Sequence, residues 1–331
     1  MQAEQHDRTL VQVADVSARL LADRDDLADA LTVLDRAEAA AGAPLVDQAE
    51  RQRLEDAVAD GSGPSEHHHA VLADRNGDCV GYAGVVIQPG VQHGVGDVAF
   101  EHGATRCSDV LRALLEGVDA LVHDHEAHGT QLWIRQATAN DVLVAVAAGY
   151  AVDRRLAVLG RATDDCDGLD EATVRAAAPE DVDDVVAVLA AAYAGTPDAG
   201  WDRARFEEHA AQDWFRFEDL LVAPADDGGL LGIHWTKRRG DGVGEVYNLA
   251  VAPRGQGRGL GRRLLDAGLA HLCNVGCSEV LLWVDLANEA AVRLYTTGGF
   301  TARWEDIAFI RHARGVGRHQ HGDRPQQRPD R

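Results

Sequence analysis

The sequence is poor in cysteine and contains no long apolar run. Nowhere do eighteen apolar residues follow one another, and the polar start Met1-Gln2-Ala3-Glu4 has no apolar signal segment, so we expect neither a membrane-spanning helix nor a secretory signal peptide. Scattered cysteines without a paired CxxC spacing are typical of thiols in a reducing cytosol. These features predict a soluble, cytoplasmic protein. The five cysteines are Cys79, Cys107, Cys166, Cys273 and Cys277.

The chain offers no convincing metal site. Cys273 and Cys277 are one helical turn apart, but no second pair closes a zinc site around them. The histidine triplet at residues 67–69 lies between Gly, Pro and Ser punctuation and a strand, and no other ligand is close to it in the sequence. A solvated loop is the simpler interpretation of the triplet, and we predict no metal.

Positive charge is scarce as well. The chain has 32 Lys and Arg against 54 Asp and Glu, a formal net charge of -22. Such a field repels nucleic acid and anionic lipid surfaces, so we expect neither as a partner. A small cation such as an amine is favoured, although surplus acid on a protein is more often a solvated surface than a steering device.

A chain of 331 residues suggests two domains by size, and a weak internal repeat supports two. Each half has the same order of predicted elements and ends in a strand-like run, at residues 154–159 and 304–310. In the first half the order is strand 80–84, strand 96–100, helix 108–123, strand 131–135 and helix 140–149. In the second half it is strand 231–235, strand 244–251, helix 260–273, strand 280–284 and helix 288–297.

Composition marks the domain limits. Residues 161–172 are polar, acidic and aperiodic, as expected of a linker. Residues 314–331 are rich in Arg, His, Gln and Pro and lack an apolar anchor, which predicts a disordered tail. We therefore predict a first domain over residues 1–160 and a second over residues 173–313. We expect a monomer.

Glycines alternate between the second strand and the long helix of the second half, at Gly255, Gly257, Gly259 and Gly261. Glycine permits positive φ and close approach of a ligand to the backbone, and N–H groups at a helix N-terminus attract phosphate. A Walker loop is excluded because no Lys-Ser/Thr follows the last glycine, and no register fits the dinucleotide GxGxxG spacing. The turn predicts a phosphate-bearing ligand, against the alternative of a glycine-rich loop without one.

The turn Gln256-Gly257-Arg258-Gly259-Leu260-Gly261 resembles the Q/R-x-x-G-x-G/A turn of the GNAT acetyltransferase superfamily. The downstream run from Asn288 to Tyr295, followed by Gly299-Phe300, resembles the second CoA-contacting helix of that superfamily. The resemblance implies an α/β (α+β) fold of two tandem GNAT domains, each a mixed, mostly antiparallel sheet flanked by helices, and acetyl-CoA as co-substrate. The implied acetyl-CoA contacts are Leu249, Ala250, Val251, Gln256, Gly257, Arg258, Gly259, Leu260, Gly261, Arg262, Asn288, Glu289, Ala290, Ala291, Val292 and Arg293.

The tandem layout, with His234-Trp235-Thr236-Lys237 and Gly244-Glu245-Val246-Tyr247 before the turn, resembles the actinobacterial mycothiol acetyltransferase family. The resemblance implies acetylation of the cysteinyl amine of desacetylmycothiol, a pseudodisaccharide thiol. Two alternatives stay open, because the CoA motifs do not choose the acceptor. One is a GNAT enzyme for another small amine or a protein N-terminus, and the other is a non-enzymatic acyl-CoA-binding module.

Two residues are the catalytic candidates. An α-amino group with a pKa of about 7.7–8.0 needs only a modest base, and the family resemblance places that base at Glu245. Tyr295 would protonate or hydrogen-bond the leaving thiolate. As bare sequence, Glu245 could be an edge-strand acid facing water and Tyr295 a core aromatic.

The resemblance also implies residues that hold the acceptor. They are Asp47, Asp198, Lys237, Glu245 and Trp283. Acids suit an ammonium-bearing ligand, and their attraction falls once acetylation neutralises the amine. The family pattern favours Glu at the places of Asp47 and Asp198 and Tyr at the place of Trp283, and Asp47 taken alone is typical of a solvated surface.

The first half departs further from the pattern. Residues 101–108 lack the alternating glycines, and the helix from Asn140 has no tyrosine corresponding to Tyr295. We therefore predict a first domain that keeps the GNAT fold but has lost catalysis and ordinary CoA binding.

Overall fold

The computed structural model describes residues 9–60, 68–87, 94–102, 107–125, 128–163, 174–226 and 228–312. The chain forms two compact units, which we call unit 1 and unit 2. Unit 1 consists of the described residues up to Arg155 and from Glu305 onward, and unit 2 spans Leu156 to Trp304. Among the described residues, no helix is both long and apolar enough to cross a membrane.

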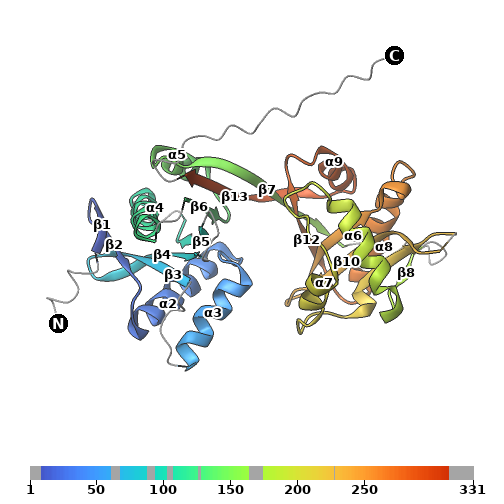
Figure 1. The fold of residues 1–331 in the computed structure, drawn as a ribbon, viewed down its shortest axis with the longest axis horizontal. Coiled ribbons are helices and arrows are strands. Elements are labelled where there is room, and N and C mark those ends of the chain that lie inside the picture. The colour runs from blue at the N-terminus through green and yellow to red at the C-terminus, as the bar shows by residue number, and fades with distance from the viewer. Residues whose placement is uncertain are drawn as a thin grey trace, which may run out of the picture. The chain divides into compact units, whose positions relative to one another are not determined.

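Unit 1 is a sheet in the order β1-β2-β3-β4-β5-β6-β13 with helices on both faces (Figure 1). All neighbouring strands are antiparallel except β5 and β6. Helix α4 covers one face and helices α2 and α3 the other, so alternate strand residues enter two cores. The elements are β1 (Thr9–Val13), β2 (Val16–Leu20), α2 (Arg24–Ala41), α3 (Gln48–Asp60), β3 (His68–Arg75), β4 (Asp78–Val86), β5 (Gly94–Phe100), α4 (Cys107–Asp124), β6 (Gly129–Ile134), α5 (Ala139–Ala147) and β13 (Thr301–His312).

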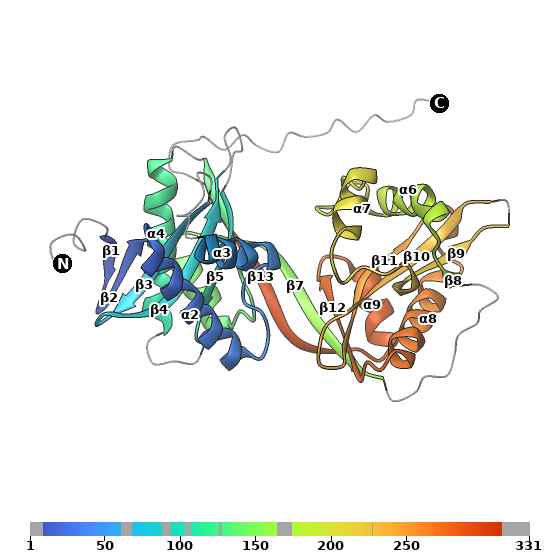
Figure 2. The same cartoon turned by 90° about the horizontal axis from the view of Figure 1, so that it is seen from below.

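Unit 2 repeats this plan, with its sheet in the order β7-β12-β11-β10-β9-β8 and only β11 and β12 parallel. Figure 2 shows α6 and α7 on one face of this sheet and α8 and α9 on the other. The predicted fold is confirmed. The elements are β7 (Ala151–Ala162), β8 (Arg175–Ala176), α6 (Val182–Tyr193), α7 (Arg203–Ala210), β9 (Leu220–Pro224), β10 (Leu230–Arg238), β11 (Val243–Val251), α8 (Leu260–Asn274), β12 (Glu279–Asp285) and α9 (Glu289–Thr297), with short 3-10 turns at Pro179–Asp181, Phe217–Asp219 and Pro253–Gly255.

The two closing strands are exchanged between the halves of the sequence. From Leu156 on, β7 pairs with β12 of unit 2, although β7 follows the first repeat. From Ile307 on, β13 pairs with β6 of unit 1, although β13 ends the second repeat. Ile307 and Phe309 are buried in the core of unit 1. The sequence pattern predicts both strands correctly but does not indicate their partners.

Local sequence fixes the ends of several helices. Asp23 caps the N-terminus of α2 by accepting the N–H groups of Asp25 and Asp26, and Gly42 ends the helix with φ of 68°. Thr138 and Asp141 form a capping box at α5. Helix α8 is amphipathic, with Leu260, Leu264 and Leu265 among its buried residues. The predicted helices at 108–123, 140–149, 260–273 and 288–297 are all present.

Strand β7 runs to Ala162, beyond the predicted end of the first domain at residue 160. Residues 164–173, most of the predicted linker, and the predicted tail at 314–331 lie outside the described residues. Cys79, Cys107 and Cys277 are free thiols as expected, but the prediction is wrong for Cys273, which is disulfide-bonded. Cys166 is outside the described residues.

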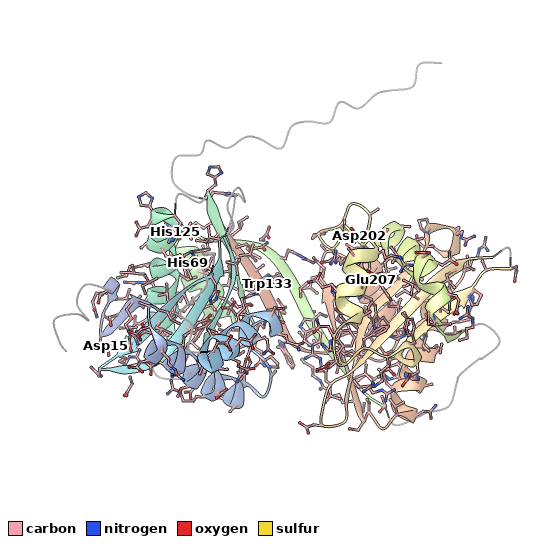
Figure 3. The ribbon with its side chains drawn as sticks, turned by 60° about the horizontal axis from the view of Figure 1, so that its bottom comes forward. Asp15, His69, His125, Trp133, Asp202 and Glu207 are labelled. Atoms are coloured by element: carbon pink, nitrogen blue, oxygen red, sulfur yellow. The ribbon has the colours of Figure 1, made fainter. Side chains whose placement is uncertain are left out.

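The histidine triplet is not a solvated loop where the structure describes it. His68 and His69 belong to strand β3, whereas His67 is outside the described residues. His68 is buried and its Nε2 lies 2.7 Å from Oε1 of Glu50. His69 packs against His125 of unit 1, with ring centroids 4.0 Å apart (Figure 3). Strand pairing fixes the backbone of both histidines, and these partners contact their rings.

Candidate active site

The glycine turn of unit 2 has the backbone shape that the sequence predicts. Gly257 and Gly259 have φ of 73° and 72°, and a Cβ at either would meet nothing within 4 Å. Backbone conformation, rather than crowding, therefore requires glycine at these positions. Gly259 is the N-cap of the 15-residue helix α8, so the turn presents N–H groups at a positively polarised helix end.

The strand before the turn is opened on one side. β11 pairs with β12 only at Val243, Gly244 and Glu245, although both strands continue. β12 beyond Leu281 keeps its pairing with β7 alone. The backbone of Leu249, Ala250 and Val251 therefore has no ladder partner on the β12 side.

A bulge accompanies this opening. Trp235 of β10 is opposite Asn248 and the next residue, Thr236, is opposite Val246, so Tyr247 is the extra residue of β11. A bulge bends its strand and re-aims the groups on either side. Gln256 at the start of the turn donates its Nε2–H to the backbone oxygen of Val251 at 3.1 Å. The turn is thereby tied to the end of the opened strand.

Glu245 lies at the last position of β11 that pairs with β12 and is buried, with only 9% of its side chain exposed. Its carboxylate accepts a hydrogen bond from Nε of Arg239, with Oε2 at 2.6 Å. Arg239 also stacks on Trp283, its Cζ 4.7 Å from the ring centroid. Lys237 is the cross-strand partner of Glu245. The structure thus brings three predicted acceptor contacts, Lys237, Glu245 and Trp283, to one sheet face.

Tyr295 lies on α9 and is buried against Phe300, with an edge-to-face ring separation of 6.0 Å. Burial, and to a smaller extent the phenol of Tyr193, raises the pKa of Tyr295 well above its ordinary value. Tyr193 in turn donates its hydroxyl to Oδ1 of Asn248 at 3.1 Å. Tyr295 is therefore protonated at neutral pH and lies within electrostatic reach of a side chain that contacts the opened strand.

The remaining predicted CoA contacts lie at two helix N-termini. Asn288 is the N-cap of α9 and accepts the N–H of Ala291 at 3.1 Å. Arg258 is exposed in the turn. Arg262 is held by Asp266, at 2.8 Å and 2.9 Å, and donates to the backbone oxygen of Thr297 at 3.1 Å. These contacts tie α8 to α9 and compete with any interaction between Arg262 and phosphate.

The other predicted acceptor contacts lie on loops. Asp198 is exposed between α6 and α7 of unit 2, and Asp47 is exposed between α2 and α3 of unit 1, the corresponding connection. Asp47 also has a structural role, because its Oδ1 accepts the N–H of Ala49 at 2.8 Å at the start of α3. Lys237 lies over Trp214, 4.4 Å from the ring centroid, and near Tyr247 at 5.6 Å.

Known proteins similar to this chain decide its family. A family model described as Acetyltransferase (GNAT) family matches residues 186–300. A protein named mycothiol acetyltransferase from Stackebrandtia nassauensis is 34% identical over 298 residues, which cover 87% of this chain and 96% of that protein. The chain belongs to the mycothiol acetyltransferase family.

Solved structures confirm the tandem fold of this mycothiol acetyltransferase family member. A GCN5-related N-acetyltransferase from Sphaerobacter thermophilus matches with a TM-score of 0.65 and 19% identity, covering 89% of this chain and 95% of that chain. A tandem GNAT protein from the clavulanic acid biosynthesis pathway matches with a TM-score of 0.61 and 15% identity, covering 89% and 98%. The chain is thus an acyltransferase built from two GNAT folds.

In this family member, unit 1 lacks both catalytic candidates. In each unit one strand glycine packs on the long helix, Gly81 in unit 1 and Gly232 in unit 2. Val86 lies five residues after Gly81, and Lys237 lies five residues after Gly232. Lys237 is opposite Glu245, and Val86 is opposite Val95. Val95 therefore takes the place of Glu245. Ala145, the seventh residue of α5, takes the place of Tyr295, the seventh residue of α9.

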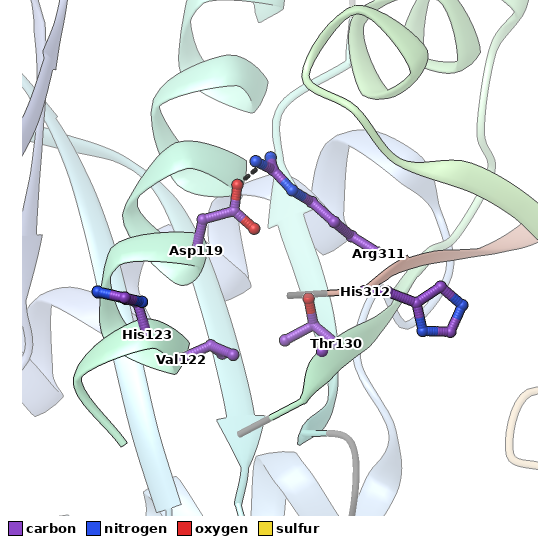
Figure 4. Close-up of a pocket in the computed structure, with 7 residues that line it drawn as sticks. Asp119, Val122, His123, Thr130, Arg311 and His312 are labelled. Carbon is purple, nitrogen blue, oxygen red and sulfur yellow. Dashed lines mark ion pairs between the residues drawn. The ribbon is translucent and has the colours of Figure 1, made fainter. Parts of the chain in front are cut away.

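Unit 1 has a hollow of its own, of about 350 Å³. Figure 4 shows the Asp119–Arg311 ion pair beside it, with residues of α4, β6 and β13 around it. The lining residues are Asp119, Val122, His123, Gly129, Thr130, Arg311 and His312. None of them is a predicted site residue. Among the described residues, no group of three or more His, Cys, Asp or Glu side chains is placed to hold a metal ion.

Sequence reasoning missed three residues of the unit 2 site. Tyr193, Asn248 and Arg239 carry no motif, and each reaches the site through tertiary contacts. Only Arg239 left a signal in the sequence. It lies two residues after Lys237, and alternation along a strand places residues at this spacing on one face.

Proposed function

We propose that this protein transfers the acetyl group of acetyl-CoA to the cysteinyl amine of desacetylmycothiol, which completes mycothiol. The relative named mycothiol acetyltransferase supports the choice of acceptor. The observation that carries the proposal is the coincidence in unit 2 of the positive-φ glycine turn, the opened β11 and β12 pair, and buried Glu245, a combination that the described residues of unit 1 do not repeat.

The reaction begins with the amine in its neutral form. Glu245 receives the proton of the attacking amine, directly or through water, while the amine nitrogen bonds to the thioester carbon. The carbonyl oxygen gains negative charge in this step and is stabilised by a backbone N–H of Leu249, Ala250 or Val251 on the open side of β11. The carbon–sulfur bond then breaks, and the amide and the CoA thiolate separate.

Tyr295 serves the leaving thiolate. Burial raises the pKa of Tyr295, whereas a thiol ionises near pH 8.5. Complete proton transfer from the phenol to the thiolate is therefore uphill, and Tyr295 acts by donating a hydrogen bond to the sulfur as negative charge develops there. The thiolate takes its proton afterwards, from water or from protonated Glu245.

The acceptor is held by the loop and strand residues described above. Asp198 and Glu245 of unit 2 attract an ammonium group, and Lys237 and Trp283 lie on the same sheet face as Glu245. A contact of Asp47, which belongs to unit 1, with the acceptor remains a prediction. Acetylation removes the positive charge and weakens these attractions, which helps the product to leave. A cytoplasmic location, a monomeric state and the absence of nucleic-acid and membrane partners remain predictions.

The purified protein tests this function when it is incubated with acetyl-CoA and desacetylmycothiol, with a peptide carrying a free N-terminus as comparison. We expect the pseudodisaccharide to gain one acetyl group by mass spectrometry with release of CoA. Acetylation of the peptide alone would identify a different acceptor class. Binding of acetyl-CoA without transfer to either amine would favour a non-enzymatic module.

A further inference from the structure

The β10–β11 turn brings a second cation to the acceptor side of the site. The backbone N–H of Arg239 donates to the oxygen of Val243 at 2.8 Å, which fixes Arg239 at the base of the turn. Its guanidinium then spans two predicted acceptor contacts, the carboxylate of Glu245 and the ring of Trp283. Arg239 is about one third exposed, so solvent reaches it.

The hydrogen bond from Arg239 makes the two carboxylate oxygens of Glu245 unequal. Arg239 holds Oε2 at 2.6 Å. Within the described part of the chain, no other side chain hydrogen-bonds this carboxylate, so Oε1 is left for the incoming amine. Lys237 is instead placed over the rings of Trp214 and Tyr247. A base that is oriented by a third group is the general arrangement of efficient proton transfer.

We infer that Arg239 is a positioning residue for acetyl transfer, which holds Oε2 of Glu245 and directs Oε1 to the acceptor amine. The stack on Trp283 keeps the guanidinium in place. The inference rests on the proposed function of Glu245 as the group that receives the amine. It adds that Arg239 sets both the orientation of the Glu245 carboxylate and the positive charge near the amine.

The charge of Arg239 has a consequence for pH dependence. The charged and titratable side chains around Glu245 are Arg239 from the turn, Lys237 from β10, and His209 of α7, whose ring lies 6.1 Å from that of Tyr247. On β12, Leu281 is opposite Glu245 and Trp283 lies against Arg239, both without charge. Alternation places Glu279, which is paired with Arg303, and Asp285 on the same face of β12. A cation near the amine disfavours its ammonium form, so more of the amine is neutral at a given pH.

The test compares Arg239→Gln and Arg239→Lys with the wild-type protein over a range of pH. For the Gln variant we expect kcat/KM for the acceptor to fall about tenfold to a hundredfold, because the carboxylate loses its orientation. We expect the acidic limb of the kcat profile, which reports groups in the enzyme–substrate complex, to move up by about half a pH unit, because the ammonium form of the bound amine is no longer disfavoured. The Lys variant keeps the charge, so its limb stays in place while kcat/KM falls, since Lys lacks the planar group that stacks and donates through Nε.

Arg303→Gln is the matched control. Arg303 also pairs with a glutamate of unit 2, Glu279, at 2.6 Å and is similarly exposed. Its loss should leave the profile unchanged. KM for acetyl-CoA should stay within about twofold in every variant, since the changes lie on the acceptor side, and thermal unfolding checks that each variant is folded.

The outcomes separate the inference from the proposed function. Wild-type kinetics and an unmoved limb in Arg239→Gln would overturn the role of Arg239 while acetylation of desacetylmycothiol stands. Failure of the wild-type protein to acetylate desacetylmycothiol or the peptide would overturn both. If the Gln variant does not fold, the Lys variant decides: reduced acceptor kcat/KM with the limb in place supports the inference, and unchanged kinetics contradicts it.

Discussion

Units 1 and 2 share one order of elements, yet among the described residues only unit 2 has its parallel strand pair opened part-way. In unit 2, pairing of β11 with β12 stops at Glu245 and a bulge follows at Tyr247. In unit 1, β5 and β6 pair over five positions to the end of β6, and β5 has a regular register with β4. The fold alone therefore does not make the site. A few residues of lost pairing, with a glycine turn beside them, distinguish the two sheets.

The interiors differ at the same place. Gly84 of unit 1 and Trp235 of unit 2 each lie three residues after the glycine that packs on the long helix. In unit 2, Trp235 is the centre of an aromatic cluster beneath α6 and α7. In unit 1 the corresponding space holds Glu50 and Tyr82, whose side chains a Cβ at Gly84 would overlap. Unit 1 has thus replaced an aromatic core with buried charge and hydrogen bonds.

Loss of the Glu245 carboxylate, whose place in unit 1 is taken by Val95, should have the largest effect on activity. Glu245→Gln should lower kcat/KM by about 10²- to 10⁴-fold, because it removes the base and keeps the shape. Affinity for acetyl-CoA, measured by calorimetry, should stay similar. Glu279→Gln, which alters the Glu279–Arg303 pair of the same unit, should leave turnover unchanged. Equal turnover in wild type and Glu245→Gln would refute the assignment.

Loss of the Tyr295 hydroxyl, in whose place unit 1 has Ala145, should lower activity less than loss of the Glu245 carboxylate. Tyr295→Phe should lower kcat about tenfold to a hundredfold with little change in KM, because the hydrogen bond to the thiolate forms as the bond to sulfur breaks. Single-turnover kinetics checks the chemical step. Tyr150→Phe is the control, since Tyr150 is a buried tyrosine of unit 1 that donates to Asp119 at 3.0 Å. The same loss of kcat in both variants would point to a general effect on stability.

The buried charge of unit 1 should appear as a pH-dependent stability. Burial raises the pKa of Asp97 to about 6, against the opposing effect of Arg135. A carboxyl whose folded pKa lies above its unfolded value binds more protons when folded, so its contribution to stability falls as pH rises from about 4 to about 6. Asp97→Asn should therefore raise the free energy of unfolding at pH 7 by about 1–2 kcal/mol. It should also flatten the dependence between pH 4 and 6 in chemical denaturation.

Glu50 acts in the opposite sense. Its hydrogen bonds with His68, Tyr82 and Arg53 outweigh burial and lower its pKa to about 2. Its contribution to stability is present above about pH 4.5 and is lost as pH falls towards 2. The acid limb of the stability curve should therefore survive in Asp97→Asn. A variant curve parallel to wild type between pH 4 and 6 would contradict the assignment to Asp97.

Much of unit 2 could be predicted from its sequence. Alternation and helical periodicity located the strands and helices, and the glycines between Val251 and Leu260 indicated the turn, because each of these signals is local. The exchange of β7 and β13 could not be predicted. The alternation of apolar and polar residues shows which face of a strand is buried, but it does not show which strand pairs with it. The contact between Arg239 and Trp283 also depends on strand order, as the two residues are far apart in the chain.

The paired registers also show which residue of unit 1 corresponds to Glu245. In sequence, Asp97 lies one residue after a glycine, as Glu245 does, and could be taken for its counterpart. The bulge at Tyr247 shifts the register, so Val95 lies opposite Val86 where Glu245 lies opposite Lys237. A bulge adds a residue without a reliable composition signal, and the difference between the two sites is visible only in the paired strands.

Unit 2 alone is expected to bind acetyl-CoA and perform the chemistry, and the stoichiometry of acetyl-CoA binding distinguishes this from a chain with two working units. Titration calorimetry on the full chain should give one equivalent. Gly259→Ala should weaken that site about tenfold, because a residue with Cβ costs roughly 1–2 kcal/mol at φ of 72°. Gly276→Ala, at φ of 92° beyond the far end of α8, should leave affinity unchanged. Two equivalents, or one equivalent that Gly259→Ala does not weaken, would contradict the claim.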